Sequence, residues 1–494
     1  MFFEKRGILF RKNAGKGRMS LKENDQITGK YASDSALLRE RLGCARSFDL
    51  VERTMCVAER QAALYFVDGL VKDEVMEKVM EFLLKLKPED VDGLSLQAFA
   101  DRNVPYIERD AVTGLAELAD GVLCGQIGLL LDGLVGAILI DARTYPTRGA
   151  EEPDGDKVLH GARDGFVETI VTNTALLRRR LRTGDLIMEY HAVCDRSKTD
   201  VVLCYLDGKA NPKLLARVRE RIARIDLHAL TMTQQTLSQC LLDRQWWNPF
   251  PRMRLTERPD VAAAQVAEGR ILVLVDNSPV VMVIPSILFD FSQEANDFYF
   301  PPLVGSFLRL MRMTGVLLTL FLVPVWFLLI QNPGWLSEPL QFLLIENESP
   351  VPVFWQLVVT EVVLDILRMA SMNTPTTLSN AFSVVGALLL GDFGIQVGWL
   401  VPEVVLYMGF TTVASFSQPS YELGYAIKIF RVVFLILTAL WNVWGFAAAF
   451  VLLVLALLCT RTVGKSNYLR PIAPFSGNIL ANMFRSRPAK RDNT

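Results

Sequence analysis

Three charged residues inside an apolar stretch have a spacing from which a membrane protein could build a site. Glu361, Asp365 and Arg368 are four and three residues apart, which places them on one face of a helix. A charge at the centre of a bilayer costs about 2.5–3.5 kcal/mol on insertion scales, so this face must contact protein or water. Two interpretations stay open. The carboxylates attract cations along an ion path, or an internal ion pair orients packed helices.

Four further charges in the same region each have a functional and a structural interpretation. Asp392 lies in the glycine-rich segment LLLGDFGIQVGW, which favours close helix packing over a break in the helix. Glu403 follows a proline at the expected start of a helix, where a carboxylate caps the positive end of the helix dipole; a place in a pore ring is the alternative. Lys428 and Arg431, three residues apart, either extend to phospholipid or pair with the two carboxylates of the first stripe.

A run of arginines ends a helix in the preceding, more polar part of the chain. It consists of Arg178, Arg179, Arg180 and Arg182. Cationic side chains at a helix C-terminus are favourable on a solvated surface, which is the simpler interpretation. The alternative is contact with anionic lipid or a neighbouring subunit, so these residues are candidate oligomer or lipid contacts.

Residues for catalysis or metal binding do not gather anywhere in the sequence. The seven cysteines are scattered without a CxxC spacing, and His160, His191 and His228 are far apart. There is no nucleophile elbow and no glycine-rich phosphate loop, so we expect neither an enzyme nor a cofactor or metal site. A net charge of −1 argues against binding to nucleic acid.

The stripe of charges lies in a region that reads as membrane-spanning. Residues 313–330 are eighteen in number without a charge, enough to cross most of a hydrocarbon core of roughly 30 Å. Arg309 and Arg312 precede this run and Arg461 follows the last one, whereas residues 331–350 contain acidic but no basic residues. The positive-inside rule then places both termini in the cytoplasm and predicts an even number of crossings, between four and six. The sequence WNVWG at 441–445 is a plausible break within the last run.

The expected fold is an α/β soluble N-terminal region of two small domains followed by an all-α polytopic membrane domain. Alternating strand and helix patterns indicate the two α/β domains, and polar stretches separate them. The expected parts are a disordered basic N-terminus (1–33), a first α/β domain (34–147), a second α/β domain (156–292), a transmembrane helical domain (303–462) and a basic cytoplasmic tail (463–494).

Several segments, in order along the chain, resemble the A-subunit (GerA) family of bacterial spore germinant receptors. They are GARDGFVETIVTNTALLRRRLR, DRSKTDVVLCYLDGKANP, NPFPRMRLTERPDVAAAQVAEGRILVLVDNSP, PPLVGSFLRLMR, LRMASMNTPTTLSNAFSVVGALLLGD and SQPSYELGYAIKIFR. The resemblance implies a multi-pass protein of the spore inner membrane with its soluble domains on the core side. It also implies a homo-oligomer, a pentamer, around an ion-conducting pore used in germination.

Other segments, RTYPTRGAEEPD, WWNPFP, ILRMASMNTPT and LVPEVVLY, are most similar to one branch of that family. That branch implies a role in amplifying ion release, with a small membrane protein as partner beside the germinant receptor subunits and membrane lipid. Two alternatives to the channel stay open. One is a non-conducting scaffold of a receptor complex, and the other is a transporter of spore small molecules such as dipicolinate.

Overall fold

The computed structural model describes residues 26–104, 106, 108–145, 161–345, 349–373, 391, 393–463 and 468–469. These residues form two compact units, described separately below. The α/β unit comprises Met1–Asp243 and Met253–Pro285, and the helical unit comprises Arg244–Arg252 and Ser286–Thr494. The helical unit thus begins before residue 292, the expected end of the second α/β domain. It also contains a loop, Arg244–Arg252, that the sequence analysis placed in the second α/β domain.

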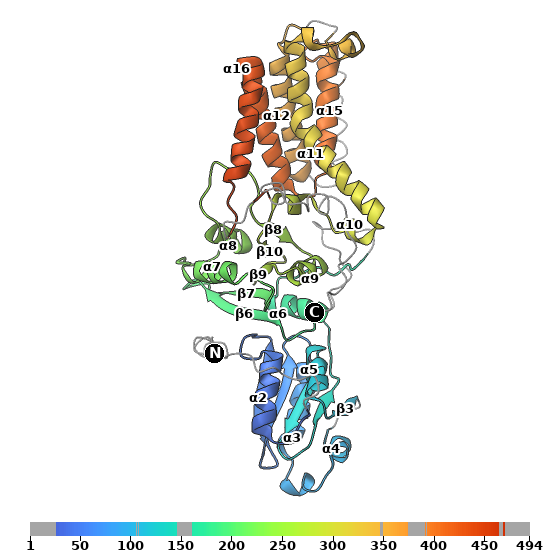
Figure 1. The fold of residues 1–494 in the computed structure, drawn as a ribbon, viewed down its shortest axis with the longest axis vertical. Helices are drawn as coiled ribbons and strands as arrows, with labels where there is room; N and C mark the ends of the chain where they lie inside the picture. Colours follow the sequence, from blue (N-terminus) through green and yellow to red (C-terminus); the bar gives the residue numbers. More distant parts are fainter. Residues whose placement is uncertain are drawn as a thin grey trace. The chain divides into compact units, whose positions relative to one another are not determined.

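The first α/β domain is a five-stranded antiparallel sheet in the order β1-β2-β4-β5-β3, with helices on both faces (Figure 1). Its strands are β1 (Leu50–Val57), β2 (Arg60–Val67), β3 (Arg109–Val112), β4 (Ile127–Leu131) and β5 (Ala137–Ile140). Its helices are α2 (Tyr31–Leu42), α3 (Asp73–Leu84), α4 (Leu96–Asn103) and α5 (Leu115–Leu123).

Burial on both faces explains the composition of the central strands. Every residue of β4, IGLLL, is buried, because α2 and α5 pack on one face of the sheet and α3 and α4 on the other. A strand covered on both faces reads as a continuous apolar run rather than as an alternating one. The edge strand β1 differs, because its exposed middle carries polar residues.

The second α/β domain repeats the first. Its sheet order, β6-β7-β9-β10-β8, matches the first strand for strand, and all pairs are again antiparallel. The strands are β6 (Leu186–Val193), β7 (Thr199–Leu206), β8 (Arg254–Thr256), β9 (Ile271–Val275) and β10 (Val281–Ile284). The helices are α6 (Ile170–Arg180), α7 (Pro212–Ala223), α8 (Thr233–Leu241) and α9 (Pro259–Ala267).

Equivalent hydrogen bonds confirm that the two domains share one design. Asp132, just after β4, accepts a hydrogen bond from the first amide of α2 at 3.0 Å. Asp276, just after β9, accepts one from the first amide of α6 at 3.1 Å. A carboxylate at this position satisfies an otherwise unpaired amide and favours the positive helix end. A sequence signal was present, since an Asp-Gly pair follows both β2 and β7, with the left-handed glycines Gly69 and Gly208.

Helix α6 contributes to the cores of both domains. Ala175 packs into the core of the first domain, whereas Leu176 and Leu177 pack into that of the second. The segment before β1 reaches in the opposite direction, because Phe48 belongs to the second core and its amide donates to the carbonyl of Met188. The two domains of the α/β unit are therefore interlocked through shared elements.

The chain is folded before residue 33, where the sequence placed the end of a disordered N-terminus. Residues 1–25 lie outside the described part, but residues 26–33 are folded. Ile27 is buried in the first core, Gln26 bridges to Gly114, and α2 begins at Tyr31. Asp34 accepts hydrogen bonds from the amides before the helix, which explains why a polar segment is ordered here.

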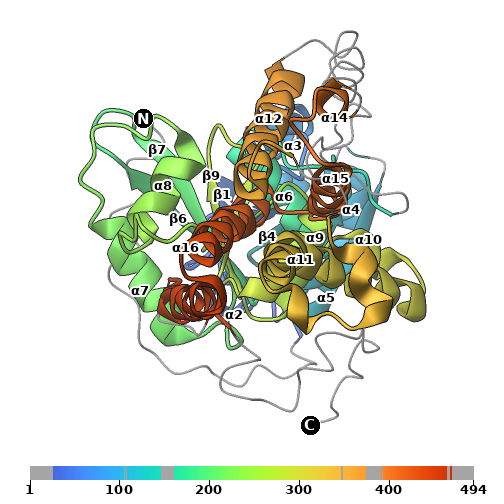
Figure 2. The same ribbon diagram turned by 90° about the horizontal axis from the view of Figure 1, so that it is seen from above.

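The helical unit is a bundle of apolar helices. Its main helices are α11 (Pro302–Gln331), α12 (Val353–Asn373), α15 (Pro402–Phe416) and α16 (Tyr421–Cys459), with short turns η2 (Leu288–Ser292), α10 (Asn296–Tyr299), η3 (Pro333–Trp335), η4 (Glu338–Leu343) and α14 (Gly394–Gln396). By length and composition two of the described helices, α11 and α16, could cross a membrane. Figure 2 shows the helices nearly end-on.

Helix α16 is a hairpin of two antiparallel arms. The backbone leaves helical geometry at Trp441 and Asn442, inside the WNVWG segment where the sequence suggested a break. Side-chain rings on opposite sides of the turn meet, since the Phe434 and Phe446 centroids are 5.0 Å apart. Gly445 permits this approach, because a Cβ there would lie 1.8 Å from the carbonyl oxygen of Leu437. We call residues 421–440 the first arm and 443–459 the second arm.

The basic residues that precede the first apolar run are buried. Arg312 forms ion pairs with Glu294, at 2.6 Å, and with Asp297, and Arg309 lies 3.8 Å from Asp297. Both arginines are over nine-tenths buried. The positive-inside prediction counted them among the basic residues before the first apolar run, and in the structure carboxylates of the same chain pair with them.

Candidate functional site

The polar stripe predicted on α12 meets two basic residues on the first arm of α16. Nη2 of Arg431 lies 2.6 and 2.8 Å from the two carboxylate oxygens of Glu361. Nζ of Lys428 lies 2.8 Å from Glu361 Oε1 and also pairs with Asp365. These are the ion pairs that the sequence offered as one alternative for Lys428 and Arg431. We call these four residues the ionic cluster.

Burial divides the ionic cluster into a closed and an open part. Glu361 and Arg431 are 5% and 4% exposed, and Arg431 also donates to the carbonyl of Thr319 on α11 at 3.3 Å. Three helices therefore converge on the closed pair. The side chain of Asp365 is 33% exposed and that of Lys428 16%. Asp365 is consequently the carboxylate of the cluster that water or a neighbouring chain can contact.

The charges of the ionic cluster balance, two against two. In the closed pair a single guanidinium nitrogen, Nη2 of Arg431, contacts both carboxylate oxygens of Glu361. A buried arginine–carboxylate pair neutralises its own charge and does not by itself attract a cation. The partly exposed lysine–aspartate pair is different, because water or a neighbouring chain can compete for it. The arrangement can thus orient three helices and leave the Lys428–Asp365 pair accessible.

Arg368 shares the predicted face of α12 but has other neighbours. Its guanidinium carbon lies 5.1 Å from the ring centroid of Phe416, 5.6 Å from that of Tyr421 and 5.4 Å from that of Tyr425. These rings come from the end of α15 and the start of α16. Cation–π contacts of this kind stabilise an arginine in partly desolvated surroundings.

The two remaining intramembrane candidates are less informative. Glu403 lies in the first turn of α15 directly after Pro402, the helix-start position that the sequence predicted. Its Oε2 atom is buried without a hydrogen-bond partner in the described part of the chain, which fits an interaction with the helix dipole. Asp392 lies outside the described residues.

The four arginines of the run differ in burial, and Arg178 does not lie on the predicted surface. Its side chain is fully buried and forms two hydrogen bonds to Asp49, at 2.8 and 3.0 Å, and one to Ser47. Arg178 belongs to the second domain and its partners to the segment before β1 of the first. It therefore joins the two domains inside one chain and is no contact for lipid or another subunit.

The other three arginines stay nearer the surface. Arg180 pairs with Asp164 at 2.7 Å, and Arg179 lies over the ring of Tyr145 at 4.4 Å. Arg182 is exposed and donates to the carbonyl of Arg179. Of the run, these residues keep the surface position on which the predicted contact depends.

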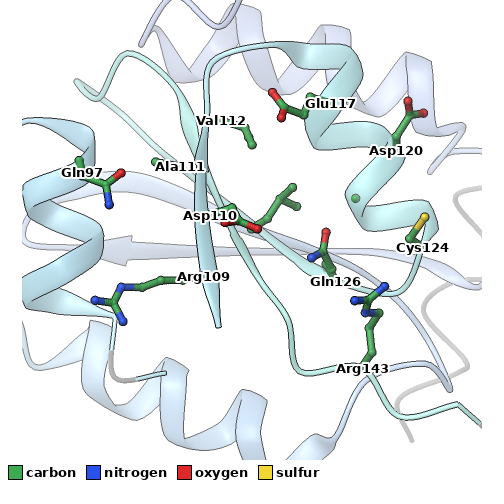
Figure 3. Close-up of a pocket in the computed structure, with 12 residues that line it drawn as sticks. Gln97, Arg109, Asp110, Ala111, Val112, Glu117, Asp120, Cys124, Gln126 and Arg143 are labelled. Carbon is green, nitrogen blue, oxygen red and sulfur yellow. The ribbon is translucent and has the colours of Figure 1, made fainter. Parts of the chain in front are cut away.

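The sequence analysis missed an open pocket of about 560 Å³ in the first domain. Its lining comes from α4, β3, α5, β5 and the adjoining loops and includes Gln97, Arg109, Asp110, Glu117, Asp120, Gln126 and Arg143 (Figure 3). Both arginines are engaged by the protein: Arg109 pairs with Asp101 at 3.0 Å, and Arg143 pairs with Asp141. Hydrogen bonds from Arg143 lower the pKa of Asp141 below its usual value. Because the lining residues come from separate segments of the chain, no local sequence motif predicts the pocket.

The whole region from the first helix to the C-terminus matches one family of proteins. The model of the Bacillus/Clostridium GerA spore germination protein family matches residues 36–494. The chain belongs to the GerA spore germination family. The expected resemblance is therefore confirmed, and the structure itself shows the expected mixed α/β region followed by a helical one.

Individual relatives agree with this family membership. The chain is 37% identical over 458 residues to Stage V sporulation protein AF of Bacillus subtilis (strain 168), which covers 93% of this chain and 92% of that protein. This protein names the branch that the sequence motifs resembled. Spore germination protein A1 of the same organism is 27% identical over 453 residues, 90% of this chain and 92% of its own. A crystal structure of the N-terminal domain of the A subunit of the Bacillus megaterium germinant receptor GerK3 covers 54% of this chain and 99% of that one, with 24% identity and a TM-score of 0.42.

Proposed function

We propose that this chain is a subunit of an oligomeric ion channel of the spore inner membrane that promotes or amplifies ion release during germination. The observation that carries the proposal is the ionic cluster between apolar helices, with its partly exposed Asp365. Membership of the GerA family supplies the biological setting.

The exposure of Asp365 argues for an assembly. An ionised carboxylate twelve residues into α12, about 18 Å along it, would lie deep in the bilayer. Facing lipid there costs about 2.5–3.5 kcal/mol, so neighbouring copies or water must cover it. A closed ring of subunits provides both, with one copy of the cluster per subunit around a wet path. The family resemblance favours five subunits.

The course of the described helices fits the proposed multi-pass topology. At one end of the bundle, Asn332 after α11 hydrogen-bonds Asn442 in the α16 turn, and Ser349 before α12 donates to Gly398 before α15. The chain enters α11 and leaves α16 at the opposite end, as an even number of crossings requires. We place that opposite end, the α/β unit and both termini on the cytoplasmic, core side.

The proposed partners follow from the same setting. They are further copies of this chain, a small membrane protein, germinant receptor subunits and membrane lipid, with no part for nucleic acid. The proposal includes no catalytic step and no cofactor.

A non-conducting scaffold is the second candidate, and the closed Glu361–Arg431 pair favours it. That pair is satisfied within one chain and holds α11, α12 and α16 together. If Asp365 is likewise closed off in the assembly, the cluster has only a structural role.

Ion flux through liposomes containing the purified full-length chain separates the two candidates. Asp365→Asn keeps the size of the side chain but removes its charge, and should lower cation flux while the oligomer stays intact by gel filtration. Glu338→Gln, in the exposed η4 turn, is the matched control and should leave flux unchanged. No flux from an intact wild-type oligomer would support the scaffold. Equal flux from wild type and Asp365→Asn would remove the cluster from the ion path.

A further inference from the structure

The loop Arg244–Arg252, RQWWNPFPR, leaves the second α/β domain between α8 and β8 and belongs to the helical unit. It is fixed to the end of the second arm of α16. The buried side chain of Asn248 donates to the carbonyl of Ala456 at 3.3 Å and to Thr460 Oγ1 at 2.6 Å. Gln245 donates to the carbonyl of Cys459 at 3.0 Å and accepts from the amide of Arg461. The place of the loop along the helix is therefore defined by four hydrogen bonds.

An aromatic contact holds the other side of the loop. The ring of Phe250 stacks on Phe430 of the first arm, with centroids 5.3 Å apart, and is buried. The loop is thus anchored to both arms of the α16 hairpin. The two tryptophans within this anchored loop, Trp246 and Trp247, are not buried.

Trp246 is 89% exposed and Trp247 is 50% exposed. Exposing two adjacent tryptophans in water is costly, because a tryptophan buries on the order of 200 Å² of largely apolar surface when it finds a partner. A rigid loop that holds them outward indicates that something outside the described chain receives them.

The surface next to the tryptophans identifies the partner. On the second arm Leu452, Leu455 and Leu458 are about half exposed and form a stripe that continues to the last turn. Directly beyond it the chain becomes charged, with Arg461 exposed, and Arg244 is exposed at the start of the loop. The tryptophans therefore lie at the level where the apolar surface of the helix gives way to basic residues. That is the level at which tryptophan and arginine concentrate in membrane proteins, with the ring at the headgroup region and the cation near phosphate.

The start of α11, at the same end of the bundle, also exposes apolar side chains. In the opening turns of α11, Leu303 and Phe307 are exposed, whereas Arg309 and Arg312 are turned inward to their carboxylates. At about 45 Å, α11 is longer than a hydrocarbon core, so its first turns must extend into the interface.

We propose that Trp246 and Trp247 insert into the headgroup–acyl boundary of the bilayer at the end of the bundle where α11 begins and α16 ends, and anchor the helical unit to phospholipid there. The inference rests on the proposed membrane location. The loop fixes the depth of the α16 hairpin and ties it to the same boundary as the entry of α11.

Photo-cross-linking from the loop tests the anchor. Benzoylphenylalanine replaces Trp246 in the full-length chain, reconstituted in phosphatidylethanolamine–phosphatidylglycerol vesicles, and illumination is followed by mass spectrometry and gel electrophoresis. Replacing an exposed ring by another should leave folding intact, and the same probe at Trp247 gives an independent second variant. Phospholipid adducts are expected at both positions.

Two matched positions make the outcome decisive. The probe at Trp444, 83% exposed at the opposite end of the second arm, should also give lipid adducts if the helical unit is in the membrane. The probe at Phe82, an exposed ring of the first α/β domain, should give none. Adducts at 444 without adducts at 246 and 247 would overturn the anchor while leaving the membrane location in place. Cross-linked dimers in place of lipid adducts at 246 and 247 would overturn it in favour of a subunit contact.

Discussion

Replacing Arg431 by methionine removes the positive half of the closed pair and tests whether the ionic cluster holds the helices together. Removing one partner of a buried ion pair costs about 3–5 kcal/mol, because the remaining charge stays buried without compensation. Lys428 keeps its 2.8 Å contact with Glu361, so we expect the lower end, about 3 kcal/mol. This corresponds to roughly a 100-fold change in the folding equilibrium.

The assay is the fraction of detergent-solubilised full-length chain that remains monodisperse by fluorescence-detected gel filtration after heating. Arg431→Met should lose its folded peak well below the wild type. Lys428→Met is the matched control and should cost less than Arg431→Met, since Glu361 then keeps its contact with Arg431 and Asp365 is one-third exposed. The double variant Glu361→Gln/Arg431→Met should regain most of the loss, because no charge is then left unpaired. A wild-type melting profile for Arg431→Met, or a double variant no better than the single one, would refute this account of the cluster.

Three further substitutions test other parts of the fold. Gly445→Ala should disrupt the α16 hairpin, since the added methyl would lie 1.8 Å from a backbone oxygen, whereas Gly409→Ala has open space; monodispersity after extraction distinguishes them. Arg178→Met should destabilise the α/β unit by about 3–5 kcal/mol because its buried aspartate partner loses its charge pair, and limited proteolysis should show cleavage that exposed Arg182→Met does not cause. Burial opposes ionisation of Glu189, but the ion-pair contact with His191, at 3.0 Å, and the hydrogen bonds from Arg219 outweigh it and lower its pKa from 4.5 to about 2. Its carboxylate therefore stabilises the fold fully above pH 4.5, and this contribution, about 3 kcal/mol, is lost as the pH falls through about 2. Denaturant titrations should show a flatter pH dependence in this range for Glu189→Gln, and an unchanged profile would contradict the pairing.

Much of the architecture could be predicted because it follows local patterns. A few consecutive residues are enough to indicate the apolar period of a helix, a continuous apolar strand or the break near Trp441. The stripe of Glu361 and Asp365 was found in the same way, since helical spacing alone puts the residues on one face.

The features that were missed depend on contacts between distant segments. In the sequence Arg178 is one of four similar arginines, because its neighbours do not reveal that its partner is Asp49, 129 residues away. Arg309 and Arg312 looked like solvated charges for the same reason. The duplication of the α/β domains was hidden because it is carried by topology and a few turn residues, not by similar side chains on the strands.

The docking of the Arg244–Arg252 loop has a consequence for synthesis of the protein. Asn248 is translated 208 residues before its acceptor at Ala456. At 5–20 residues per second, roughly 10–40 s pass before that acceptor leaves the ribosome. In this interval the remaining strands of the second domain emerge and can pair, but the hydrogen bonds that fix the loop to the second arm cannot form. A nascent chain stopped just before residue 456 should therefore carry a protease-sensitive site at the two tryptophans, which closes only when the final helix has been made.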